Sequence, residues 1–263
     1  MLAKQVTMST GTLLNLIRRR GGEPHQILAS TPTWLSEDAQ RKENERADKE
    51  LAGAGLAGRR GVDPGLLATV DAIARPQLEY YAWINGGYDG KSLDYNLLAG
   101  AAGAEGFVLA RNTKQEGVVV ASVHPSELLP EFIGQIPRLA AGKGNTLSVP
   151  KSELGGNRRT TAQDEGFSVM QSGRQSAGSQ EADELRRVLH LPRLGGGSLY
   201  VALRNRSGSR VRVDKPVNYI DTSEGRWLTE ETAGRGEPLI VFTPATTAVL
   251  TERLRAAQST LGG

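Results

Sequence analysis

Three histidines are the side chains in this sequence best suited to acid–base catalysis or metal binding. His25 lies in an expected irregular connection, His124 at an expected strand–helix junction and His190 at an expected helix end. None of them is spaced from another histidine or from a carboxylate as zinc ligands are. A histidine at a helix C-terminus is also favoured by the helix dipole alone. We therefore expect no catalytic residue and no metal site.

Other catalytic motifs are missing from the sequence. Its 263 residues include no cysteine, which excludes disulfides, thiolate metal sites and a cysteine nucleophile. No G-x-S-x-G motif occurs, so the sequence contains no nucleophile elbow. These absences predict a protein that is not an enzyme, although an active site dispersed over the chain stays open.

Two glycine-rich stretches resemble phosphate-binding loops in composition only. Residues 195–198 (GGGS) precede an expected strand, whereas a dinucleotide-binding loop follows a strand and opens a helix. Residues 142–144 (GKG) lack the Ser or Thr that follows the lysine of a P-loop. Both stretches are expected to be connecting segments, and we expect no bound cofactor.

Arginines give the second half of the chain a basic character, although the net charge of the whole chain is only +3. They are Arg158, Arg159, Arg174, Arg186, Arg187, Arg204, Arg206, Arg210 and Arg212. Tyr200 is the aromatic residue near them, and a nucleic-acid surface usually interleaves cations with aromatic rings. A solvated basic rim is therefore favoured, and a nucleic-acid-binding regulatory protein is the alternative function.

Aromatic residues gather in two other stretches and suggest contacts with a protein. Tyr81 and Trp83 share one face of an alternating strand and are expected in the core, so that Tyr80 points outward. Exposed aromatic side chains are typical of protein interfaces. The candidate partner-binding residues are Tyr80, Tyr88, Tyr95, Tyr219, Arg226 and Trp227. Residues 221–226 (DTSEGR) also fit a simple hairpin turn, and both interpretations stay open.

The elements that position these residues occur twice. Residues 78–139 and residues 198–261 each contain four strand-like runs followed by a helix, which is entered through Pro125 or Pro244. A short strand and helices precede each copy; Ser9, Ser36 and Asp63 are suited to cap the first three helices. Short hairpin loops predict a mainly antiparallel sheet. We expect one domain over 1–263, composed of halves 1–142 and 143–263, with a mobile loop over 155–180.

The sequence also bears on location. No window approaches the stretch of about 18 apolar residues that a membrane span needs. The first twenty residues carry their charges after the apolar part, unlike a signal peptide. We expect a cytoplasmic protein without membrane insertion. Abundant glycine and alanine suggest GC-rich coding and an actinobacterial source.

The run YIDTSEGRWL at 219–228, followed by FTP at 242–244 and an amphipathic helix, resembles the EspG family. These proteins are the cytosolic chaperones of ESX (type VII) secretion systems in mycobacteria and related actinobacteria. The resemblance extends back through the Asp63-Pro64 helix and the first four-strand module to the N-terminal strand and helices.

The resemblance implies a fold of α/β class (α+β type) with a quasi-two-fold repeat. A central, mainly antiparallel sheet would be flanked by two helical bundles. It also implies a non-enzymatic protein that binds the tip of the PPE subunit in PE–PPE heterodimers and delivers it to one ESX system. The implied contact uses the sheet, the C-terminal helices and a loop between early strands, here residues 86–92. A homodimer through an exposed sheet or helices is a further partner that the pattern leaves open.

Overall fold

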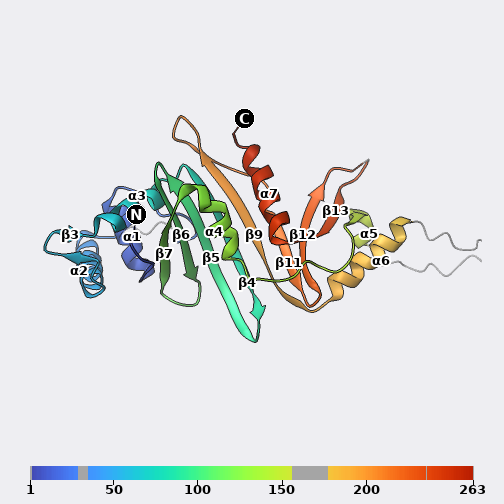
Figure 1. Ribbon diagram of the computed structural model, residues 1–263, viewed down its shortest axis with the longest axis horizontal. Coiled ribbons are helices and arrows are strands. Elements are labelled where there is room, and N and C mark those ends of the chain that lie inside the picture. Colours follow the sequence, from blue (N-terminus) through green and yellow to red (C-terminus); the bar gives the residue numbers. More distant parts are fainter. Residues whose placement is uncertain (1, 29–34, 156–176, 235, 263) are drawn as a thin grey trace, which may run out of the picture. The chain divides into compact units, whose positions relative to one another are not determined.

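The computed structural model describes residues 2–28, 35–155, 177–234 and 236–262 (Figure 1). The chain forms two compact units. The first unit comprises Met1–Arg138, Gly196–Pro216 and Thr247–Gly263, and the second comprises Leu139–Gly195 and Val217–Thr246. These units cut the chain differently from the halves 1–142 and 143–263, so the division into two duplicated halves stays a prediction.

The first unit contains an antiparallel sheet with the strand order β1-β7-β6-β5-β4-β9, and β10 pairs with β9. Register is antiparallel in the β1–β7, β6–β7, β5–β6, β4–β5 and β9–β10 pairs. The strands are β1 (Val6–Met8), β4 (Leu78–Tyr88), β5 (Lys91–Ala102), β6 (Glu105–Asn112), β7 (Val118–Val123), β9 (Arg193–Arg204, in this unit from Gly196) and β10 (Arg210–Arg212).

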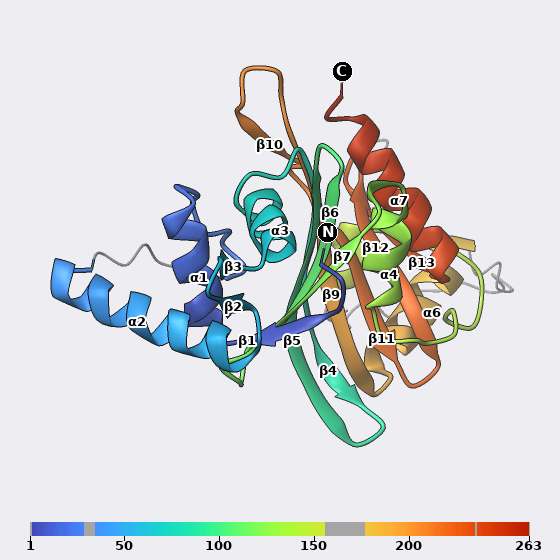
Figure 2. The same cartoon turned by 60° about the vertical axis from the view of Figure 1, so that its left-hand side comes forward.

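Helices cover both faces of this sheet. Figure 2 shows α1–α3 on one side of β5–β7 and α4 with α7 on the other. The helices are α1 (Thr10–Arg19), α2 (Glu37–Gly53), α3 (Pro64–Ala74), the 3-10 turn η1 (Pro125–Glu127), α4 (Leu128–Gly134) and α7 (Thr247–Ser259). A small hairpin of β2 (Ala57–Gly58) and β3 (Gly61–Val62) follows α2. The first core cluster joins α1 and α3 to the side chains on one face of β4–β7.

The three predicted helix caps of the first unit are confirmed. Each cap side chain accepts a hydrogen bond from the backbone N–H three residues later, as a good N-cap does. The pairs are Ser9 with Thr12 at 3.1 Å, Ser36 with Ala39 at 3.3 Å and Asp63 with Leu66 at 2.8 Å. Pro130 lies in the first turn of α4, where its missing N–H removes no helical hydrogen bond.

The second unit has four antiparallel strands in the order β11-β12-β13-β8. They are β11 (Val217–Thr222), β12 (Gly225–Thr232), β13 (Leu239–Pro244) and β8 (Leu147–Pro150), with α5 (Lys151–Gly155) and α6 (Ala177–His190). A second core cluster joins α6 to Trp227 and Phe242 of these strands. In each unit the short strand that opens a repeat pairs with the last strand of its four-strand module, as β1 does with β7 and β8 with β13.

Three expected boundaries differ from the structure. The run 211–222 is not one strand, because it divides into β10 and β11 on either side of Pro216, which cannot donate a ladder hydrogen bond. Residues 86–92 are mostly strand. Only Asp89 and Gly90 form the turn, with φ of 51° and 74° as a type I′ hairpin requires.

The third concerns the loop expected over 155–180, because Gly155 ends α5 and residues 177–180 belong to α6. Residues 156–176 of that loop lie outside the described residues. Within the described ranges, no helix combines the length and hydrophobicity of a membrane span. The overall class is α/β with mainly antiparallel sheet, as predicted.

Candidate protein-binding surfaces

Tyr80 does not point outward, contrary to the prediction. Its side chain is 2% exposed, its hydroxyl donates to Gln258 Oε1 of α7, and its ring centre lies 5.7 Å from that of Phe132 in α4. Burial raises the pKa of Tyr80 to about 12. Strand alternation did not predict the burial of both tyrosines, because each face of β4 is covered by distant segments. α4 and α7 cover Tyr80, and the rings of His25 and Tyr200 pack against Tyr81.

Trp83, which was expected in the core beside Tyr81, is 36% exposed. Its ring lies 5.3 Å from that of Tyr200 at 88°, and Tyr200 stacks on Tyr81 at 5.0 Å. The Arg212 guanidinium lies 5.2 Å from the centre of the Tyr200 ring. We call Tyr81, Trp83, Tyr200 and Arg212 the aromatic shelf. A partly exposed tryptophan beside a stacked tyrosine and a cation is the composition of a protein-contact hot spot.

Glu79 is a buried carboxylate next to the aromatic shelf. Glu79 forms an ion pair with Arg210 of β10, and the Nε2 atom of His25 lies 3.5 Å from its Oε1. Burial alone would raise the pKa of the Glu79 carboxyl, but the hydrogen bonds and charges of His25 and Arg210 together lower that pKa below its ordinary value. The ion pair therefore holds β10 and the residue 25 segment against the sheet. Among the three histidines, His25 thus has a structural contact with a buried carboxylate.

Arg226 and Asp221 form a buried ion pair in the second unit. Arg226 donates from Nε and Nη2 to the two carboxylate oxygens of Asp221, at 2.7 Å each. The guanidinium also lies 4.3 Å from the centre of the buried Tyr219 ring. Both charges are removed from water, so each depends on the other for compensation. These residues are internal in the free chain.

The backbone of Arg226 holds a segment that is distant in sequence. Its N–H donates to the Ala140 carbonyl at 2.8 Å, and its carbonyl accepts from the N–H groups of Gly142 at 2.8 Å and Ala245 at 2.9 Å. The buried Trp227 ring packs directly against Gly142, where an added Cβ would lie 2.3 Å from the ring. The DTSEGR run is therefore a turn that also clamps residues 140–142.

Tyr88 and Tyr95 are the two predicted partner-binding residues that remain partly exposed. Tyr88 is the last residue of β4 and precedes the Asp89-Gly90 turn. Tyr95 on β5 donates its hydroxyl to the Gln135 carbonyl at 2.6 Å, which leaves its ring edge partly accessible. The partner contact of these two residues stays a prediction.

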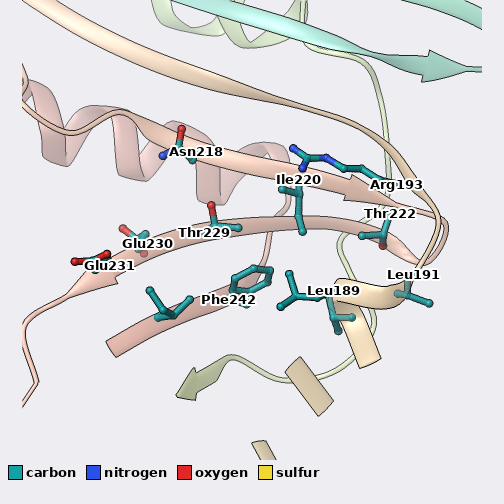
Figure 3. A pocket seen from close by; sticks show the side chains of 12 residues that line it. Leu189, Leu191, Arg193, Asn218, Ile220, Thr222, Thr229, Glu230, Glu231 and Phe242 are labelled. Carbon is teal, nitrogen blue, oxygen red and sulfur yellow. The ribbon is translucent and has the colours of Figure 1, made fainter. Parts of the chain in front are cut away.

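A pocket of about 380 Å³ lies within the second unit between α6 and strands β11–β13 (Figure 3). Its apolar lining includes Leu189, Ile220 and Phe242, and its polar rim includes Arg193 and Glu230. Leu189 is 50% exposed, whereas Leu185 and Val188 of the same helix are buried. An apolar pocket with charged residues at its rim suits the side chains of a protein partner.

The chemistry of these surfaces is that of binding. Within residues 2–28, 35–155, 177–234 and 236–262, no group of three or more His, Asp or Glu side chains could hold a metal ion. The sequence analysis missed the shelf and the pocket. The usable signals were the Tyr81/Trp83 spacing and the apolar Leu189 next to the end of its helix. Both patterns fit buried core residues equally well, and only the packing of the surrounding elements shows that Trp83 and Leu189 are exposed.

The sequence profile of the EspG family matches residues 14–256. The chain belongs to the EspG family. Its fold is similar to that of the Mycobacterium tuberculosis type VII secretion system chaperone EspG5, solved in complex with a PE25–PPE41 dimer. That match has a TM-score of 0.60 and 14% sequence identity, and covers 98% of this chain and 97% of EspG5. No functionally curated protein sequence matches this EspG-family chain.

Proposed function

We propose that this EspG-family protein is a cytoplasmic chaperone of a type VII secretion system. It binds a PE–PPE-type dimer through the tip of the PPE-like subunit, keeps that tip soluble and delivers the dimer to one secretion system. It acts by binding and not by catalysis. The observation that carries the proposal is the family match across residues 14–256.

The physical properties of both units support a binding role. An apolar helical tip needs a surface with apolar depressions and a polar rim. In the second unit, Leu189 and Phe242 present such a depression between Arg193 and Glu230. In the first unit, Trp83 of the aromatic shelf is accessible for contact. The turn after Tyr88 and the edge of Tyr95 supply further accessible residues of that unit.

Co-expression tests the proposal. The protein is co-expressed with each PE–PPE pair encoded in the same genome, and complexes are isolated by affinity and size-exclusion chromatography. We expect one pair to form a soluble complex with one copy of each chain. Failure of every pair to co-purify would contradict the proposed function.

Two variants assign the contact to the surfaces. Leu189→Asp places a charge in the apolar pocket and Trp83→Ala removes the exposed ring of the shelf, and each is expected to weaken the complex at least about tenfold. Ala52→Asp provides the control, because Ala52 is an exposed apolar residue of α2 that lines neither surface. Equal affinity of Leu189→Asp and the control would exclude the second-unit pocket from the contact.

A further inference from the structure

The first unit has a second type of surface, which the proposed function does not require. A pocket of about 600 Å³ lies between the β9–β10 hairpin and the residues that follow α7. Its apolar lining is Leu203, Val211 and Leu261, and Arg204 and Arg206 line it as cations. We call it the hairpin pocket. Its volume falls within the usual range of about 300–1,000 Å³ for ligand-binding pockets.

The apolar floor of the hairpin pocket follows from the strand register. Val211 lies directly opposite Leu203 in the antiparallel β9–β10 pair, so both side chains stand on the same face. Val211 is 42% exposed, which is unusual for an apolar residue that has a cross-strand apolar partner. The floor is thus formed in the free chain and remains open to solvent.

The rim of the hairpin pocket is positively charged. Residues 203–213 include four arginines and no acidic residue. Of these four, Arg204 and Arg206 line the pocket, and Arg204 donates from Nη1 to the Gly208 carbonyl at 2.7 Å. Arg210 and Arg212 alternate with Val211 along β10 and stand on its other face, where they contact Glu79 and Tyr200. Arg206 at the hairpin turn is exposed. Among the described residues that line the pocket, Arg204 and Arg206 carry charge and no carboxylate is present, so the rim is net positive.

Local hydrogen bonds hold the hairpin turn. The Asn205 side-chain oxygen accepts from the Ser209 N–H at 2.9 Å and from the Ser207 hydroxyl at 2.7 Å. Gly208 adopts a φ of 85°, which glycine tolerates without strain. Binding at this turn therefore costs little ordering of the backbone.

We propose that the hairpin pocket docks an acidic segment of a partner protein that inserts one apolar side chain. Carboxylates would face the arginine rim, and the apolar anchor would cover Leu203 and Val211. A nucleic acid is disfavoured, because no aromatic residue lines the pocket to stack on a base. The hairpin pocket shares no lining residue with the second-unit pocket, so this inference does not depend on the proposed function.

Fluorescence anisotropy on the purified full chain tests this docking. The probe is a labelled seven-residue peptide with a central leucine flanked by three acidic residues on each side. We expect binding that weakens as salt screens the arginine rim. A serine in place of the leucine is expected to reduce affinity at least about fivefold, because the apolar anchor is lost.

Two substitutions in the protein locate the site. Val211→Asp and Arg206→Glu are each expected to reduce affinity for the peptide about tenfold, since each places a like charge against it. Leu189→Asp is expected to leave peptide binding unchanged. Circular dichroism and thermal melting of every variant show that the fold is retained. Arg206→Gln, a milder change at an exposed site, should give a smaller loss than Arg206→Glu.

Several results would overturn the docking proposal. These are the absence of peptide binding at millimolar concentration, equal binding of the leucine and serine peptides, or unchanged binding by Val211→Asp. A single-stranded oligonucleotide of equal charge that binds more tightly and displaces the peptide would indicate a nucleic-acid site instead. If Val211→Asp abolishes peptide binding and still forms the PE–PPE complex, the two surfaces act separately.

Discussion

The β5–β6 and β11–β12 hairpins close in the same register, at Ala102–Glu105 and at Thr222–Gly225, but differ at the second pair from the turn. Ala101 lies opposite Gly106 in the first unit, whereas Asp221 lies opposite Arg226 in the second. Each pair of strands is joined through two residues. The buried ion pair is therefore not required to form this turn, because the first hairpin forms it with small, uncharged residues.

The difference lies in what packs against each turn. A Cβ added at Gly106 would lie 2.6 Å from the Val123 carbonyl oxygen, so the neighbouring strand already fills that space. At the corresponding place in the second unit, the backbone of Arg226 binds residues 140–142 and Ala245. The ion pair thus stabilises an arginine whose backbone connects a remote segment to the sheet. The YIDTSEGRWL run, which carries part of the resemblance to the family, thus has a scaffolding role in this chain.

The largest expected effect is that of Arg226→Ala. This change leaves the buried Asp221 carboxylate without its partner and should lower the free energy of unfolding by about 3–5 kcal/mol. Urea denaturation followed by circular dichroism measures it. The double variant Asp221→Leu/Arg226→Met removes both charges and should be less destabilised than the single variant. A loss below about 1 kcal/mol for Arg226→Ala would show that the second hairpin, like the first, does not depend on a buried ion pair.

Gly142→Ala tests whether the clamped segment is as tightly packed as the first hairpin. The new methyl group would meet the Trp227 ring, and overpacking of this kind typically costs about 1–3 kcal/mol. Gly106→Ala should cost a similar amount, because its Cβ would meet the Val123 carbonyl. Gly117→Ala is the matched control, since nothing lies within 4 Å of its added Cβ. Denaturation curves that place Gly142→Ala with the control would refute tight packing at the clamp.

A smaller effect is expected for Tyr80→Phe. The change removes the hydroxyl that donates to Gln258 and should cost about 0.5–1.5 kcal/mol. Tyr95→Phe, whose hydroxyl bonds the Gln135 carbonyl at a more exposed site, should cost less. In the first unit, Tyr80 lies opposite Ala99. Counted from the turn of the β11–β12 hairpin, Tyr219 occupies the position that corresponds to Ala99, so each unit has a buried tyrosine at the same distance from this turn. An equal loss for both variants would mean that burial of Tyr80 adds nothing to its hydrogen bond.

Tyr80 also predicts a dependence of stability on pH. Burial raises its pKa from 10.0 to about 12 in the folded chain, so between these values the unfolded chain releases the proton and the folded chain keeps it. The contribution of Tyr80 is complete below pH 10 and is lost as the pH rises toward 12. The urea midpoint of the unchanged protein should therefore fall more steeply than that of Tyr80→Phe over this window. Parallel curves for the two proteins would contradict the assigned burial.

Local chemistry in the sequence predicted much of the fold. The caps at Ser9, Ser36 and Asp63 depend on hydrogen bonds within three residues, and such contacts can be inferred from adjacent residue types. Short connections between strand-like runs predicted antiparallel pairing, because only antiparallel strands can be joined so closely. The DTSEGR run predicted both the hairpin turn and the family.

Only the tertiary structure decided which side chains are accessible. Alternation along β4 places Tyr80 and Tyr81 on opposite faces, but exposure depends on the distant segments that cover those faces. They are α4 and α7 over Tyr80, and Tyr200 of β9 over Tyr81. The clamp between Arg226 and residues 140–142 joins positions more than eighty residues apart in the printed sequence, and no local pattern encodes it. Short-range hydrogen bonding and strand connection thus follow from the sequence, whereas burial follows from the assembly of distant segments.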